Sequence, residues 1–102
     1  MNRARLPNRR SSELIDFEFR GLAYVVGLSR YPDGRVSEVF IDCSKATSPL
    51  GADARDAAVA LSIAFQHGVP AQAIREAVTR EADGTAAGIA GAVLDLIEGN
   101  AP

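Results

Sequence analysis

Residues 52–70, ADARDAAVALSIAFQHGVP, decide the fold of this chain. Between Ala57 and Phe65 the stretch has one polar side chain, Ser62, so a helix here would be apolar nearly all round. Such a helix cannot lie on a surface with one side in water. Exposing its large side chains would cost about 1.5–3 kcal/mol each. We therefore expect a central, buried helix, covered by strands on one side and by other helices on the rest.

The residues before this helix show the period of two that is typical of half-buried β-strands. From Glu13 onward, apolar and charged side chains alternate until Gly21, and a second alternation begins at Leu22. The turn sequence YPDG at residues 31–34 leads into a third strand over residues 35–42. Its apolar residues do not alternate cleanly, which predicts a bulge near Glu38. Three strands joined by tight turns indicate an antiparallel meander that is solvated on one face.

Helical patterns follow the strands. Because Pro49 stops either neighbour from extending through it, the first helix should begin at Ala52 or Asp53. Pro70 suits the first position of a second helix. After a loop, a third helix begins at Gly88 with apolar residues at helical spacing. The fold class is α+β, a three-stranded meander followed by three helices. Residues 1–12 should form a basic arm, residues 13–98 one domain and residues 99–102 a tail.

Length and composition limit the class of protein. The chain has 102 residues, enough for one domain, and its 47% hydrophobic content is typical of a globular protein. The sequence has no run of about 18 apolar residues, so we predict no membrane span. The basic N-terminus is not followed by the apolar stretch of a secretory signal. A single cysteine, Cys43, excludes an internal disulfide. We expect a cytoplasmic protein.

The charge is distributed unevenly. Residues 1–10 contain Arg3, Arg5, Arg9 and Arg10 and no acid, whereas the rest of the chain has seven bases against thirteen acids. A basic arm on an acidic body would suit contact with nucleic acid, a phosphate ligand or an acidic patch on a partner. The alternative is a solvated terminus that folds back on its own domain.

Chemistry-bearing residues are few. His67 and Cys43 are the sole residues of their kinds and lie at opposite ends of the predicted helix, so neither a metal site nor a nucleophilic pair is expected. We predict no catalytic residue and no cofactor. The loop with Lys45, Thr47 and Ser48 precedes a helix N-terminus, where free N–H groups favour phosphate. It lacks the P-loop spacing, and ordinary helix capping is the alternative.

Five short motifs resemble one region of a known family. They are RxRLPxxRxS at residues 3–12, YxVGL at 24–28, DGRxxExFI at 33–41, KxxS at 45–48 and SxAxQxGVP at 62–70. Their order and spacing resemble the C-terminal segment of adenosylcobalamin (vitamin B12)-dependent ribonucleotide reductases, at and just before the TSCPD domain. The catalytic barrel and cysteine-rich end of that family are missing, so reductase activity and cobalamin binding are not implied. The resemblance implies an accessory or regulatory module linked to nucleotide metabolism.

Two functions remain open at this point. The first is a non-enzymatic module that binds a protein partner, such as a reductase or another nucleotide-processing enzyme. The second is a nucleic-acid or nucleotide binder that uses Arg3, Arg5, Arg9, Arg10 and Lys45. An enzyme is the least expected class. Because a three-stranded sheet has two open edges, pairing of edges or of the alanine-rich helices predicts a homodimer.

Overall fold

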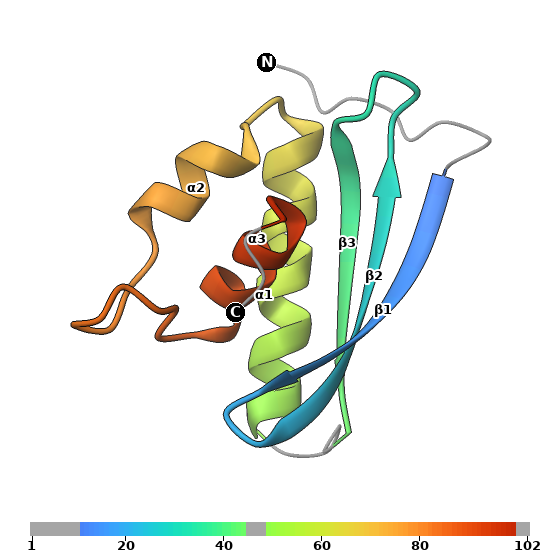
Figure 1. Cartoon of the computed structure of the whole chain (residues 1–102). Helices are drawn as coiled ribbons and strands as arrows, with labels where there is room; N and C mark the ends of the chain where they lie inside the picture. The colour runs from blue at the N-terminus through green and yellow to red at the C-terminus, as the bar shows by residue number, and fades with distance from the viewer. Residues whose placement is uncertain (1–10, 45–48, 100–102) are drawn as a thin grey trace.

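Three strands and then three helices follow one another along the chain, which confirms the predicted α+β class (Figure 1). The computed structural model describes residues 11–44 and 49–99. The strands are β1 (Ser11–Phe19), β2 (Leu22–Arg30) and β3 (Val36–Cys43), and the helices are α1 (Pro49–Gln66), α2 (Ala71–Ala77) and α3 (Ile89–Ile97). Within these residues, no helix has the length and apolar character that a membrane crossing requires.

The sheet is an antiparallel meander in the order β1-β2-β3, as the alternation predicted. Arg20 and Gly21 both have positive φ, 52° and 78°, and form the tight turn between β1 and β2. The second turn closes when the N–H of Gly34 donates to the carbonyl of Tyr31 at 2.9 Å. The pairing of β2 with β3 is regular up to Ser29 and Glu38 and then skips Ser37. The bulge predicted near Glu38 is therefore confirmed.

The core lies between one face of the sheet and the helices. Helix α1 runs along β3, and α2 and α3 lie together on one side of α1 (Figure 1). The apolar residues that β2, β3, α1 and α3 bury there form a single cluster. Its largest fully buried apolar side chains are Ile41, Leu94, Val26 and Val93.

The expectation that α1 would be covered on every side is wrong. Val59 is 58% exposed and Ile63 is 41% exposed. The reason is geometric, because α2 and α3 have only 7 and 9 residues and lie on one side of a helix of 18 residues. The helix also begins at Pro49, earlier than predicted, since proline suits a first helical turn. Pro70, predicted at the first position of the second helix, instead has an extended backbone and is the N-cap residue before α2 begins at Ala71.

Two buried polar side chains of α1 form hydrogen bonds with the outer edge of β3. The Ser62 hydroxyl accepts a hydrogen bond from the N–H of Val39 and donates one to its carbonyl, both at 2.9 Å. The Gln66 amide donates to the carbonyl of Ser37 at 2.9 Å. The polar residue in the apolar stretch thus satisfies backbone groups that point away from β2. In the described part of the chain, no helix lies along the outer edge of β1.

Candidate functional site

The binding residues predicted from the sequence lie outside the described residues. These are Arg3, Arg5, Arg9 and Arg10 of the arm and Lys45, Thr47 and Ser48 of the loop before α1. Their role in binding therefore stays a prediction. The structure describes the chain on either side of the loop, including the residues around Ser44, where the chain enters it.

Three carboxylates lie near Ser44. Asp16, Glu18 and Asp42 line a shallow hollow of about 490 Å³ together with Ser44, the last described residue before the loop. Ser44 itself is fixed to the sheet, because its N–H donates to the carbonyl of Ala23 at 3.0 Å. Like charges repel, so these carboxylates raise the free energy of a phosphate bound beside them. A phosphate site at this position would have to overcome that repulsion.

Cys43 and His67 do not form a reactive pair. Cys43 is buried at the end of β3, whereas His67 follows the last residue of α1. Helix α1 separates the two and is about 27 Å long at about 1.5 Å per residue. No group of three metal-ligating side chains occurs within residues 11–44 and 49–99.

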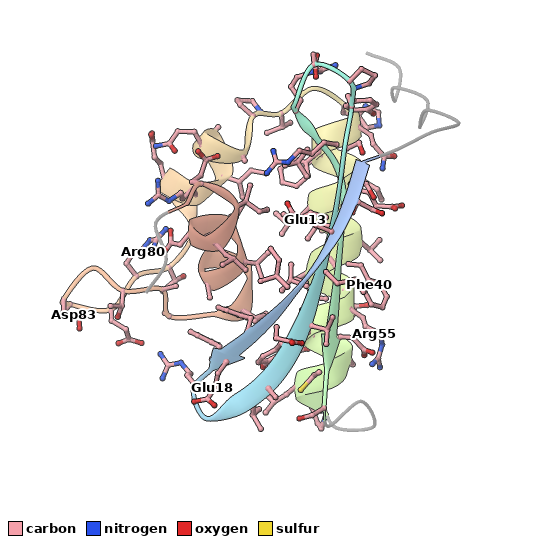
Figure 2. All side chains as sticks on the ribbon, turned by 45° about the vertical axis from the view of Figure 1, so that its right-hand side comes forward. Glu13, Glu18, Phe40, Arg55, Arg80 and Asp83 are labelled. Atoms are coloured by element: carbon pink, nitrogen blue, oxygen red, sulfur yellow. The ribbon has the colours of Figure 1, made fainter. Side chains whose placement is uncertain are left out.

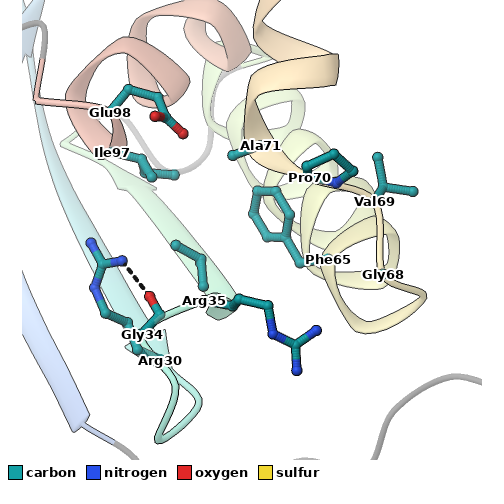
Figure 3. Close-up of a pocket in the computed structure, with 11 residues that line it drawn as sticks. Arg30, Gly34, Arg35, Phe65, Gly68, Val69, Pro70, Ala71, Ile97 and Glu98 are labelled. Atoms are coloured by element: carbon teal, nitrogen blue, oxygen red, sulfur yellow. Dashed lines mark hydrogen bonds between the residues drawn. The ribbon is translucent and has the colours of Figure 1, made fainter.

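A cleft of about 310 Å³ lies at the C-terminal end of α1, between the β2–β3 turn and the corner joining α1 to α2 (Figure 3). Arg30 and Arg35 approach it from the turn, and Phe65, Val69 and Pro70 form much of its apolar wall. Two of the motifs that carry the family resemblance, residues 33–41 and 62–70, meet here.

Both arginines of this cleft are held by the turn itself. Arg30 Nη1 donates to the carbonyl of Gly34 at 2.9 Å. Arg35 Nε donates to Asp33 at 2.7 Å, and its guanidinium lies 4.9 Å from the centre of the Tyr31 ring. Hydrogen bonds from the backbone and side chain of Arg35 lower the pKa of Asp33. Both guanidinium groups are therefore positioned by partners within the turn.

A second feature is a groove of about 460 Å³ between β3 and α1. Its exposed apolar side chains are Phe40, Val59 and Ile63, with exposed fractions of 54%, 58% and 41%. Arg55 and Glu38 add one positive and one negative side chain to its lining. Figure 2 shows Phe40 and Arg55 projecting from the same side of the molecule. We call this surface the Phe40 groove.

Sequence reasoning missed the Phe40 groove because it expected strands and helices to cover α1 on every side. The sequence contains a partial signal, which does not indicate the side of α1 that stays uncovered. Helix α1 has apolar residues on more sides than one small sheet and two short helices can cover. The uncovered part is an exposed apolar cluster, which in soluble proteins commonly marks an interaction site.

The most strongly altered ionisation in the described residues belongs to Asp95 of α3. Hydrogen bonds from Arg80, at 2.6 and 2.9 Å, are the main cause that lowers its pKa to about 2, and partial burial opposes them. Arg75 of α2 adds a further bond at 2.7 Å. A carboxylate held ionised in this way does not exchange protons near neutral pH. Its role is to fasten α2 and the following loop to α3.

Fold and surface together define a small α+β domain with an exposed apolar groove and, in the described residues, no group of metal-ligating side chains. Comparison with known proteins gives its kinship. The chain is 40% identical over 72 residues to a vitamin B12-dependent ribonucleotide reductase of Rhodopirellula baltica, and 34% identical over 77 residues to the enzyme of that name from Agrobacterium fabrum.

These matches cover 71% and 76% of this chain but only 7% and 6% of the two reductases. The chain is therefore homologous to a small part of these enzymes, and the resemblance seen in its motifs is confirmed. No protein-family model matches the chain. No solved structure gives a significant match.

Proposed function

We propose that this chain is a non-enzymatic accessory module that binds a protein partner through the Phe40 groove. The observation that carries the proposal is the apolar stripe of α1 that the chain leaves in water, with Val59 and Ile63 at its centre. Covering the exposed halves of these two side chains and of Phe40 would contribute about 3 kcal/mol of binding free energy. The lining also suits a protein surface, because charged Arg55 and Glu38 accompany the apolar residues.

The partner class in this proposal is an enzyme of nucleotide metabolism, a ribonucleotide reductase first of all. Support comes from the homology, since the matching segment of both relatives is part of a protein with that name. Within the same proposal the chain is a TSCPD-like domain equivalent to the C-terminal region of such reductases, acts in the cytoplasm and regulates its partner. In this proposal residues 13–98 form the domain and residues 1–12 and 99–102 its arm and tail, with β1 already beginning at Ser11.

The test is capture of partners from an extract of the chain's own cells, with mass spectrometry to identify them. We expect a nucleotide-metabolism enzyme to be captured by the unaltered chain and lost with the variant Val59→Asp/Ile63→Asp. The matched control is Leu50→Asp, because Leu50 is an apolar side chain 51% exposed on the same helix, outside the Phe40 groove. Failure to capture such an enzyme, or equal capture by the groove variant, refutes the proposal.

The alternative function is binding of nucleic acid or nucleotide phosphate by Arg3, Arg5, Arg9, Arg10 and Lys45. The four arginines within residues 1–10, with no acid among them, are the observation that favours it. Affinity for an oligonucleotide would then fall steeply with salt, because each neutralised phosphate releases counterions. Removing residues 1–10 should abolish the binding. Binding that survives the deletion, or that ignores salt, excludes the arm.

A further inference from the structure

The two edges of the sheet differ in how their backbone is protected. On β3 the side chains of Ser62 and Gln66 bond to three outward groups, the N–H and carbonyl of Val39 and the carbonyl of Ser37. Strand β1 has nine residues, and no helix lies along its outer edge in the described part of the chain. Long edges left unprotected are templates for pairing with another strand. Of the two edges, β1 therefore offers the longer unprotected stretch to a further strand.

The register of the sheet shows which residues of β1 point outward. The N–H of Ser44 bonds to the carbonyl of Ala23, so every second residue of β2 from Ala23 faces β3. The intervening residues of β2, from Leu22 to Arg30, face β1 and bond to their partners there. The backbone groups that point to the free edge therefore belong to the remaining residues, Ser12, Leu14, Asp16 and Glu18.

We propose that this edge pairs antiparallel with the same edge of a second copy of the chain, about a two-fold axis at Ile15, to give a six-stranded sheet. In this register all nine residues of β1 are paired. Ser12 lies opposite Glu18 of the second copy, and Leu14 opposite its Asp16. Each of these outward-facing pairs exchanges two backbone hydrogen bonds. Ile15 lies directly opposite Ile15 of the second copy.

β1 carries Glu13, Asp16 and Glu18 and no base, so a second copy can pair with it only in a register that keeps these carboxylates apart. No carboxylate lies directly opposite another in this register, whereas an axis at Glu13 or Asp16 would pair like charges. Antiparallel pairing also places the start of each β1, which follows the arginines of residues 1–10, beside the acidic end of the other β1. Leu14, 78% exposed, gains a neighbour from the second copy.

The first experiment measures association by sedimentation, with the full chain and with Leu14→Pro. The N–H of Leu14 points away from β2, so proline there removes an intermolecular bond and no bond within the sheet. We expect a dimer for the unaltered chain and a dissociation constant raised at least about tenfold for the variant. Circular dichroism checks that the variant folds. A chain that is monomeric up to millimolar concentration overturns the proposal, as does a dimer indifferent to Leu14→Pro.

The second experiment tests the axis and does not depend on the proline variant. In a Cys43→Ala background, Ile15→Cys should form a disulfide-linked dimer under mild oxidation, because directly opposite residues lie within disulfide range. Leu14→Cys is the control. It is more exposed, yet the two copies of position 14 are offset by two residues and lie beyond about 7 Å. Equal or faster cross-linking of Leu14→Cys overturns the proposed register.

Discussion

Two buried serines at the contact of α1 with β3 should respond in opposite ways to replacement by alanine. The Ser62 hydroxyl bonds to both backbone groups of Val39, a residue only 3% exposed. The Ser37 hydroxyl is fully buried and has no hydrogen-bond partner among the described residues. The two positions have the same side chain and nearly the same burial. They differ in whether the hydroxyl has a hydrogen-bond partner.

The magnitudes follow from that difference. Ser62→Ala leaves a buried N–H and a buried carbonyl unpaired, and each such group costs about 1–3 kcal/mol, so we expect a loss of about 2–3 kcal/mol. In a domain of this size the melting temperature should fall by roughly 10–20 °C. Ser37→Ala removes an unsatisfied hydroxyl and should leave stability unchanged or raise it by up to about 1 kcal/mol.

Urea unfolding followed by circular dichroism measures both free energies of unfolding. Equal slopes with urea concentration for the variants and the unaltered chain would show that the same surface unfolds in each. The reasoning is refuted if Ser62→Ala costs less than about 0.5 kcal/mol, the usual scatter of surface substitutions. It is also refuted if Ser37→Ala costs as much as Ser62→Ala.

Two other substitutions test the ion pairs and the turn. Because the folded pKa of Asp95 is about 2, below the unfolded value, its ion pairs contribute stability above about pH 4 that is lost as the pH falls towards 2. Asp95→Asn should therefore cost about 1–2 kcal/mol at pH 7, after allowance for partial solvent exposure, and almost nothing at pH 2, as pH-dependent urea unfolding would reveal. Gly34 has φ of 94°, so Gly34→Ala should cost about 1 kcal/mol and Gly34→Asn less, by thermal unfolding. An alanine variant as stable as the unaltered chain would contradict the strain argument.

Much of the fold was determined by local patterns. The alternation in residues 13–29, the turn at 31–34 and the helical spacing after Gly88 each depend on neighbours close in the sequence, and the structure agrees with all three. The homology could also be recognised from the sequence, because the order of the motifs is visible without knowledge of their contacts. The bulge beside Glu38 was visible as a break in alternation.

The contacts of α1 could not be read in the same way. Its apolar residues indicated that something must cover it, but not that the chain supplies cover for only one part of its surface. That depends on where two short helices pack, which is a property of the whole fold. The same holds for Ser62, whose partner Val39 lies 23 residues away in the chain.

The sequence by itself therefore determined the order and type of the elements, because local backbone preferences and hydrophobic period fix these. Only the tertiary structure decided which apolar residues stay in water and which sheet edge stays open. Both depend on packing between segments far apart in sequence. The Phe40 groove and the outer edge of β1 are surfaces that this packing leaves uncovered among the described residues.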